Sequence, residues 1–510
     1  MKKFLPVTAV LVLLFFSCDL DGKPNKKNPN NTRTKTFWAQ NLATAVHYQL
    51  TAELLAEGTY CKVWVEKNSG VSANTARNMA NAYDNNIYQK MIDVFSIRNF
   101  TYEDDYHRTY TFSNIMEFAD AAADGDRKLT ILLLDIKDGY RQGVNDSYVA
   151  GYFWAGNFYS PDLISNSNQC DMIYVDISPG VPGSEDSNMT LAHEMQHLMN
   201  FISSVLLREN LMDLWIDEGL SSAAEWVYLG RHDQSKLNWF NNNGVYDNNS
   251  TKVISGSIDE GNNFFVWENR LENQYAILDD YATVYLFFQW LRLQAGEDAN
   301  TLALPLPFQS IYKDIITSTQ YNHTAVLNAL NAKAQESYSD WGTLLKTWLA
   351  ANYINAVNGP YGYRSELVLK DLKAPTVAPG TTTVELYPGE GVYSITNSAG
   401  STNAQGLNIK YAGLKESPAQ VSDDYVYAGG ALLTYNINTD AAGVQEQGIT
   451  TGVAASVSAA VSAVSGGRSA FPFTGPYRIG AGDLLRRNGK DESFSGFNFS
   501  VPLREIVIHE

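Results

Sequence analysis

The chain has 510 residues, too many for a single hydrophobic core, so more than one domain is expected. Its 37 Lys and Arg stand against 55 Asp and Glu, and this net charge of −18 excludes the basic balance typical of nucleic-acid-binding proteins. After the first residues no stretch approaches about 18 uninterrupted apolar residues, so the sequence predicts no membrane-spanning helix.

The N-terminal segment resembles a bacterial lipoprotein signal. A positively charged start precedes an apolar run, residues 4–16, that is too short for a stable transmembrane helix. Ser17 then stands before Cys18, which predicts a signal peptide over residues 1–17 and lipidation of Cys18; ordinary secretion is the alternative. Residues 18–36 are rich in Asn, Lys and Pro and predict a flexible tether. We therefore expect a protein of the bacterial cell envelope, anchored at the outer membrane or cell surface, or secreted.

The next part of the chain mixes strands and helices. Strand-like runs occupy residues 59–66, 128–136 and 171–178, and helical spacing of apolar residues extends over 74–95. The segment GYFWAGNFYS, 151–160, is either an edge strand able to pair with an extended peptide or an ordinary sheet strand. A sheet of this kind before a long helix predicts an α+β fold.

Two features of this part concern cysteine and acidic residues. Cys61 and Cys170 either form a disulfide, as exported proteins often do, or stay free, since the sequence does not give their separation. Asp124 and Asp126 flank a glycine and suggest calcium, but the spaced ligands of an EF-hand loop are missing. A turn is the preferred prediction for that stretch.

The segment TLAHEMQHLM places His193 and His197 four residues apart. On a helix this spacing puts both imidazoles on one face, where they can bind one zinc ion. Glu194, rotated by about 100° from His193, can reach a water at the open coordination position and act as its general base. Asp186 and Ser187 are candidates to cap the start of this helix.

A third ligand is available further along the chain. Glu218 lies in LWIDEGLSSAAEWVYLG, a second amphipathic helix pattern that a turn near 208–210 would return beside the first helix. Two imidazoles and one carboxylate leave the fourth zinc position open, as a catalytic site requires. Glu225, seven residues after Glu218, either orients a histidine ligand or lies on a solvated face.

HEMQH followed by WIDEGLS resembles the gluzincin group of zinc metallopeptidases, in which HExxH and a later Glu bind zinc. Within that group the chain is similar to the hyicolysin-type bacterial peptidases over roughly residues 40–355. The resemblance implies a two-lobed catalytic domain with one zinc ion per chain: an N-terminal sheet lobe, the HExxH helix at the centre and a helical lobe after it. It also implies a phenol or imidazole that stabilises the oxyanion, for which Tyr281 is the first candidate and Tyr285 the second.

The composition changes near residue 374, so we predict a zinc metallopeptidase domain over 37–374 and a small β-rich domain over 375–510. Helical patterns occupy 279–296 and 326–356 before the change. Short alternating strands follow it, and they favour a β-sandwich-like domain interrupted by a low-complexity stretch at 452–467.

These observations predict an exported or lipid-anchored bacterial zinc endopeptidase that acts on proteins or peptides. Cleavage within chains is favoured because NIMEF, 114–118, lacks the Gly and Asn of the amine-binding segment found in related aminopeptidases. The alternative is a non-catalytic surface adhesin or binding protein on a peptidase-like scaffold. Nucleic acid is not an expected partner, and the membrane is expected only through the anchor at Cys18.

Overall fold

The computed structural model describes residues 33–103, 107–144, 147–208, 210–240, 265, 276–298, 310–367, 376, 378–379, 389–397, 404–414, 426–436, 445–446 and 503–508. The expected signal peptide, Cys18, most of the tether and the low-complexity stretch at 452–467 lie outside the described residues. Among the helices that are described, none is both long and apolar enough to cross a membrane.

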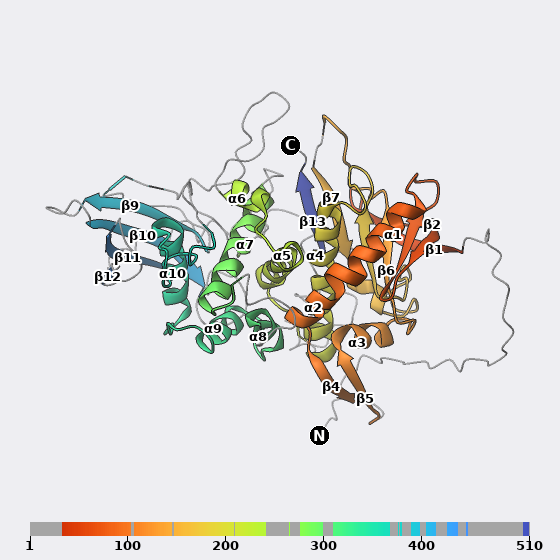
Figure 1. The fold of residues 1–510 in the computed structure, drawn as a ribbon, viewed down its shortest axis with the longest axis horizontal. Helices are drawn as coiled ribbons and strands as arrows, with labels where there is room; N and C mark the ends of the chain where they lie inside the picture. The colour runs from red at the N-terminus through yellow and green to blue at the C-terminus, as the bar shows by residue number, and fades with distance from the viewer. Residues whose placement is uncertain are drawn as a thin grey trace, which may run out of the picture.

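A mixed seven-stranded sheet forms the N-terminal lobe (Figure 1). Its three central strands are parallel, and the strands outside them pair antiparallel. In spatial order the strands are β1 (Thr34–Asn41), β2 (Val46–Glu57), β3 (Cys61–Glu66), β6 (Leu129–Leu134), β8 (Met172–Asp176), β7 (Ser147–Phe153) and β13 (Leu503–Ile508). β6 and β8 are buried along their whole length, which explains their continuous apolar sequence.

Helices cover one face of this sheet. They are α1 (Ala73–Ala82), α2 (Tyr88–Phe95), α3 (Ile115–Ala122) and α4 (Glu185–Phe201), with a π-helical turn at Tyr83–Ile87 joining α1 to α2. A two-stranded hairpin, β4 (Arg98–Glu103) and β5 (Thr109–Asn114), leads into α3. The predicted helix over 74–95 is therefore one helical segment with a π turn inside it.

The two cysteines do not form a disulfide. Both are buried and free, and they belong to the two hydrophobic cores on opposite faces of the sheet. Cys61 packs with the helices, and its Sγ lies 3.9 Å from the Ala80 carbonyl oxygen. Cys170 lies on the other face, 3.4 Å from the Met172 sulfur. The disulfide alternative is wrong because the sheet itself separates the two thiols.

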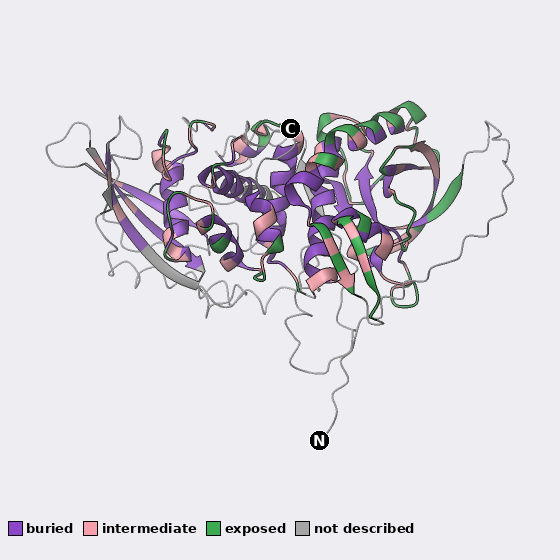
Figure 2. Ribbon diagram, turned by 60° about the horizontal axis from the view of Figure 1, so that its bottom comes forward, coloured by how far each residue is buried: buried purple, intermediate pink, exposed green. Residues whose placement is uncertain are grey.

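The helical lobe follows α4. A π-helical turn at Ile202–Leu206 ends α4, and α5 (Leu214–Leu229) then runs back beside it. The remaining helices are α6 (Gln234–Phe240), α7 (Ala276–Gln294), α8 (Ile311–Thr317), α9 (His323–Asn331) and α10 (Trp341–Ile354). The predicted arrangement of sheet lobe, central helix and helical lobe is confirmed. Figure 2 shows that the middle of the molecule is buried, whereas the β4–β5 hairpin and α1 carry exposed residues.

The C-terminal part contains a small antiparallel sheet. Its order is β12 (Gln445–Glu446), β11 (Val426–Asn436), β10 (Ala404–Leu414) and β9 (Gly391–Asn397). α10 packs on it, and the Tyr393 hydroxyl donates to the Leu349 carbonyl at 2.7 Å. Within the described residues this is one sheet covered by a helix rather than a sandwich, and β13 pairs with β7 in the N-terminal sheet instead.

Candidate metal centre

Helix α4 is the buried axis of the site. Ser184 caps its start by accepting a hydrogen bond from the Ser187 amide at 3.1 Å, so the cap lies two residues before the predicted Asp186. Glu185 and Asp186 occupy the first turn, where negative side chains interact favourably with the positive end of the helix dipole. Every residue from Thr190 to Phe201 is buried, so the helix presents His193 and His197 to protein rather than to solvent.

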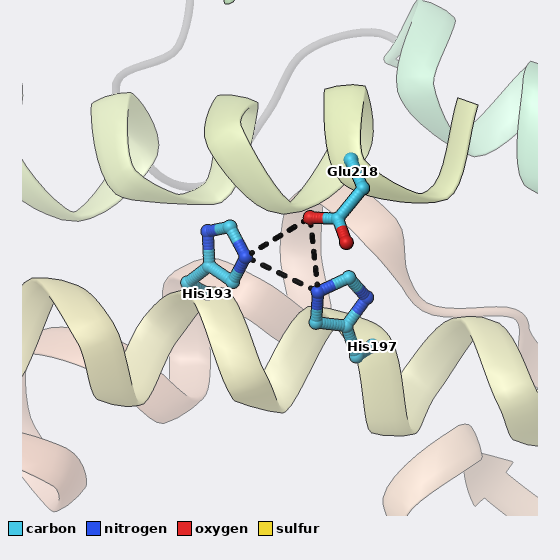
Figure 3. Close-up of side chains that lie close together, drawn as sticks. All are labelled: His193, His197 and Glu218. Carbon is cyan, nitrogen blue, oxygen red and sulfur yellow. Dashed lines mark hydrogen bonds and ion pairs between the residues drawn. The ribbon is translucent and has the colours of Figure 1, made fainter. Parts of the chain in front are cut away.

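Helix α5 brings the carboxylate to the two imidazoles. Gly219, directly after Glu218, lets α7 approach closely: a Cβ built at Gly219 would lie 2.2 Å from Phe288 Cε2. α5 ends at Gly230, which adopts the left-handed conformation that glycine tolerates (φ 67°). Figure 3 shows the result, with His193 and His197 rising from one helix toward Glu218 on the other.

The three side chains converge on one point with the spacing of zinc ligands. The two Nε2 atoms lie 3.1 Å apart, and Glu218 Oε2 lies 3.5 Å from His193 Nε2 and 3.4 Å from His197 Nε2. Ligand atoms about 2.0–2.1 Å from a tetrahedral zinc ion are roughly 3.3–3.4 Å from one another. The observed triangle therefore has the size that such an ion needs.

The electrostatics of the triangle also fit a cation. All three side chains are fully buried, and neither carboxylate oxygen of Glu218 has a hydrogen-bond partner among the described residues. Burial opposes ionisation of Glu218, but the adjacent His197 and His193 lower its pKa to about 2. For His197, burial lowers the pKa of the imidazole, but the carboxylates of Asp217 and Glu218 outweigh this and raise it well above the usual value. A buried, ionised carboxylate beside two imidazoles is a donor set suited to zinc.

The outer nitrogen of each histidine is held by a carboxylate. His193 Nδ1 lies 2.7 Å from Glu225 Oε1, so Glu225 stands in the orienting position considered for it. His197 Nδ1 lies 3.1 Å from both Asp217 Oδ2 and Ser221 Oγ. Such contacts fix the ring orientation and leave Nε2 for the metal.

Asp217 and Ser221 were not predicted from the sequence. The available signal was helical spacing: Asp217 precedes the ligand Glu218 by one residue, and Ser221 lies four residues after Asp217 on the same face. Asn200 on α4 donates to Asp217 Oδ1 at 2.5 Å and holds that carboxylate in turn.

Glu194 is a residue of α4 whose side chain packs against strand β7. A Cβ built at Gly151 of β7 would lie 3.4 Å from Glu194 Cγ and 2.7 Å from Thr190 Cγ2, so only glycine allows this approach. The 151–160 segment thus contributes the end of β7 and then a 3₁₀ turn at Ala155–Phe158. β7 is not an edge strand, since β8 pairs with one side and β13 with the other, where Glu505 faces Gly151.

The two candidate tyrosines on α7 differ in position. The Tyr281 ring centroid lies 6.1 Å from that of His193, and Lys236 Nζ lies 5.1 Å from the centre of the Tyr281 ring. Tyr285 lies one turn further, and its hydroxyl is 2.9 Å from His232 Nδ1. His232 in turn contacts Glu366 at 3.0 Å. Tyr281 is therefore beside the metal-binding residues, whereas Tyr285 belongs to a separate network.

Gly219→Ala should disturb both stability and the metal centre. The added methyl must displace Phe288 or separate α5 from α7, and overpacking of this kind costs about 1–3 kcal/mol of unfolding free energy. Because Glu218 precedes this residue, zinc affinity should fall as well. Chemical denaturation and zinc titration of the variant would measure the two effects.

Phe288→Leu supplies the control for this substitution. If the clash is the cause, the double variant Gly219→Ala/Phe288→Leu should lose less stability than the sum of the two single variants. Strict additivity would contradict the proposed packing constraint.

Comparison with known proteins shows distant similarity to a metalloprotease. No protein-family model matches the chain. The neutral metalloprotease ShpI of Staphylococcus hyicus is 27% identical over 306 residues, which are 58% of this chain and 57% of that protein. The chain thus spans less than two thirds of the length of this curated relative. The distant homology to a metalloprotease agrees with the expected resemblance, and the buried His193, His197 and Glu218 fit an HExxH…E zinc site.

Proposed function

We propose that this protein is a zinc endopeptidase whose metal is held by His193, His197 and Glu218. The observation that carries the proposal is the convergence of two Nε2 atoms and one carboxylate oxygen within 3.1–3.5 Å of one another in a fully buried setting. Distant homology to a neutral metalloprotease supports the same class of activity.

Different residues of the chain carry out proton transfer, stabilisation of the intermediate and orientation of the ligands. When bound, zinc acidifies a water molecule and polarises the peptide carbonyl. The Glu194 carboxylate takes the proton from the attacking water and delivers it to the departing amine nitrogen. The Tyr281 hydroxyl donates a hydrogen bond to the oxygen of the tetrahedral intermediate. Glu225 and Asp217 hold the histidine rings and keep Nε2 directed at the metal.

Cleavage within chains, rather than removal of single N-terminal residues, is the favoured specificity. The segment NIMEF lacks the Gly and Asn of an amine-binding motif, and in the structure these residues end β5 and begin α3. Asn114 caps α3 by accepting from the Met116 and Glu117 amides, so the segment has a structural function of its own.

Glu194→Gln tests the proposed reaction. The amide cannot accept the proton, so hydrolysis of casein should fall by about 10²–10⁴-fold while the zinc content stays near one ion per chain. Metal analysis and a fluorescent casein assay would measure both. Glu185→Gln, in the exposed first turn of the same helix, is the matched control and should keep full activity.

Full activity of the Glu194 variant would rule out the mechanism, and folded protein without zinc would rule out the site. A zinc-loaded wild type without any hydrolytic activity would instead favour the alternative, a binding protein on a peptidase-like scaffold.

Tyr281→Phe and Tyr285→Phe form a matched pair on α7. Loss of the Tyr281 hydroxyl should lower kcat by about 10²–10³-fold with little change in KM or zinc content. Loss of the Tyr285 hydroxyl should weaken the contact to His232 and lower stability, but leave kcat almost unchanged. Steady-state kinetics and thermal unfolding of both variants distinguish the two functions, and equal kcat values would remove Tyr281 from the mechanism.

We also propose export and lipid anchoring at Cys18. The support is the sequence of the first 18 residues together with the tether composition after them. Cys18→Ala should shift the protein from the detergent phase to the aqueous phase in a Triton X-114 partition, whereas Cys170→Ala should not. An aqueous wild type would contradict the anchor.

A further inference from the structure

A second group of possible metal ligands lies where the central parallel strands begin. Asp120 at the end of α3 and Asp124 and Asp126 in the loop before β6 offer carboxylate oxygens within 4.8 Å of one another. From the sequence this loop was predicted to be a turn. The structure adds Asp120, which the helix brings to the two loop residues.

A buried fourth carboxylate, Asp171, accompanies this group. Asp171 stands directly before β8 and is 1% exposed, and its Oδ1 has no hydrogen-bond partner among the described residues. Its backbone oxygen accepts from the Thr130 amide at 2.9 Å, which fixes it beside the start of β6. Strand alternation puts its side chain on the same face as Ile173, the face that α3 covers.

Asp171 lies at the start of β8, next to the start of β6, and so beside the loop that carries Asp124 and Asp126. Burial raises the pKa of Asp171 well above its ordinary value, and the charges of Asp124, Asp120 and Asp126 raise it further. Lys62 pairs with Asp126, but no other ion pair to these four carboxylates occurs within the described part of the chain. Three ionised carboxylates within 4.8 Å of one another, with a buried fourth beside them, are unfavourable when Lys62 supplies the one paired positive charge among the described residues.

We propose that Asp120, Asp124, Asp126 and Asp171 form a calcium site. The donors are all carboxylates, each able to supply one or two oxygen atoms, which suits the six to eight oxygen ligands of calcium better than the strict octahedron of magnesium. The site has no nitrogen or sulfur donor, unlike the zinc centre. Bound calcium would tie the α3–β6 loop to the start of β8 and so stabilise the sheet that carries the active helix.

The first test uses purified full-length protein passed over a chelating resin and supplied with one equivalent of zinc. Adding CaCl₂ should raise the Tm by several degrees, and MgCl₂ or NaCl at the same ionic strength should have a much smaller effect. Isothermal titration should give one calcium ion per chain. Terbium should replace calcium and show sensitised luminescence, because Tyr83 is buried in the core on the same face of the sheet as Ile173 and Asp171.

Three Asp→Asn variants make the test specific. Asp171→Asn and Asp124→Asn should lose the calcium-dependent rise in Tm and the terbium signal, while Asp162→Asn, at an exposed position elsewhere, should keep both. Without calcium, Asp171→Asn should be at least as stable as the wild type, because it removes a buried, crowded carboxylate. Asp124 is exposed, so its variant should fold even if that of Asp171 does not.

Two outcomes would overturn the proposal. One is a wild type whose Tm and terbium luminescence do not respond to the added ion. The other is a response that Asp171→Asn and Asp124→Asn both retain, which would place the ion elsewhere on this acidic protein.

Discussion

The close approach of α4 and α5 is the constraint on which the rest of the structure depends. Two imidazoles and a carboxylate must come within 3.5 Å of one another while fully buried, and they belong to helices separated by a π turn and a loop. Two glycines allow the neighbouring elements to approach closely. Gly219 leaves room for Phe288 of α7 beside α5, and Gly151 leaves room for β7 beside α4. Larger residues at either place would move the ligands that the two helices carry.

Burying so many polar groups raises the free energy of the folded state, and hydrogen bonds and ion pairs from the surrounding residues offset that penalty. Each histidine ligand contacts a carboxylate through Nδ1, and these carboxylates have partners of their own: Asn200 for Asp217, and Lys236 for Glu225 at 3.3 Å. Removing one member would leave a buried charge unpaired, which is much less favourable than losing a surface contact. Buried polar side chains are therefore tolerated on the face of α4 toward α5, because each histidine there and Asn200 has a partner.

The parts of the site that the sequence predicted are those set by local geometry. His193 and His197 follow from the four-residue helical spacing, and Glu218 follows from an amphipathic pattern on a second helix that a short connection returns. Asp217, Ser221 and Asp171 were missed because their significance depends on which element packs against them. The sequence left the state of the two cysteines open for the same reason, since strand alternation on β3 and before β8 was needed to place the thiols on opposite faces. The pairing of β13 with β7 joins residues at least 350 positions apart, and no local pattern indicates it.

Strand β8 connects the two proposed metal sites. It begins after Asp171 and ends at Asp176, whose Oδ1 accepts from the Ile136 amide at 3.0 Å and whose Oδ2 accepts from the Ser178 and Gly180 amides at 2.8 and 2.9 Å. Those bonds shape the loop that leads to Ser184 and the start of α4. A carboxylate thus fixes each end of the strand, one through backbone amides and the other, on our proposal, through calcium. Because the strand is buried throughout and packs against α4, the Asp171 end and the helix that carries the histidines are held in one hydrophobic core.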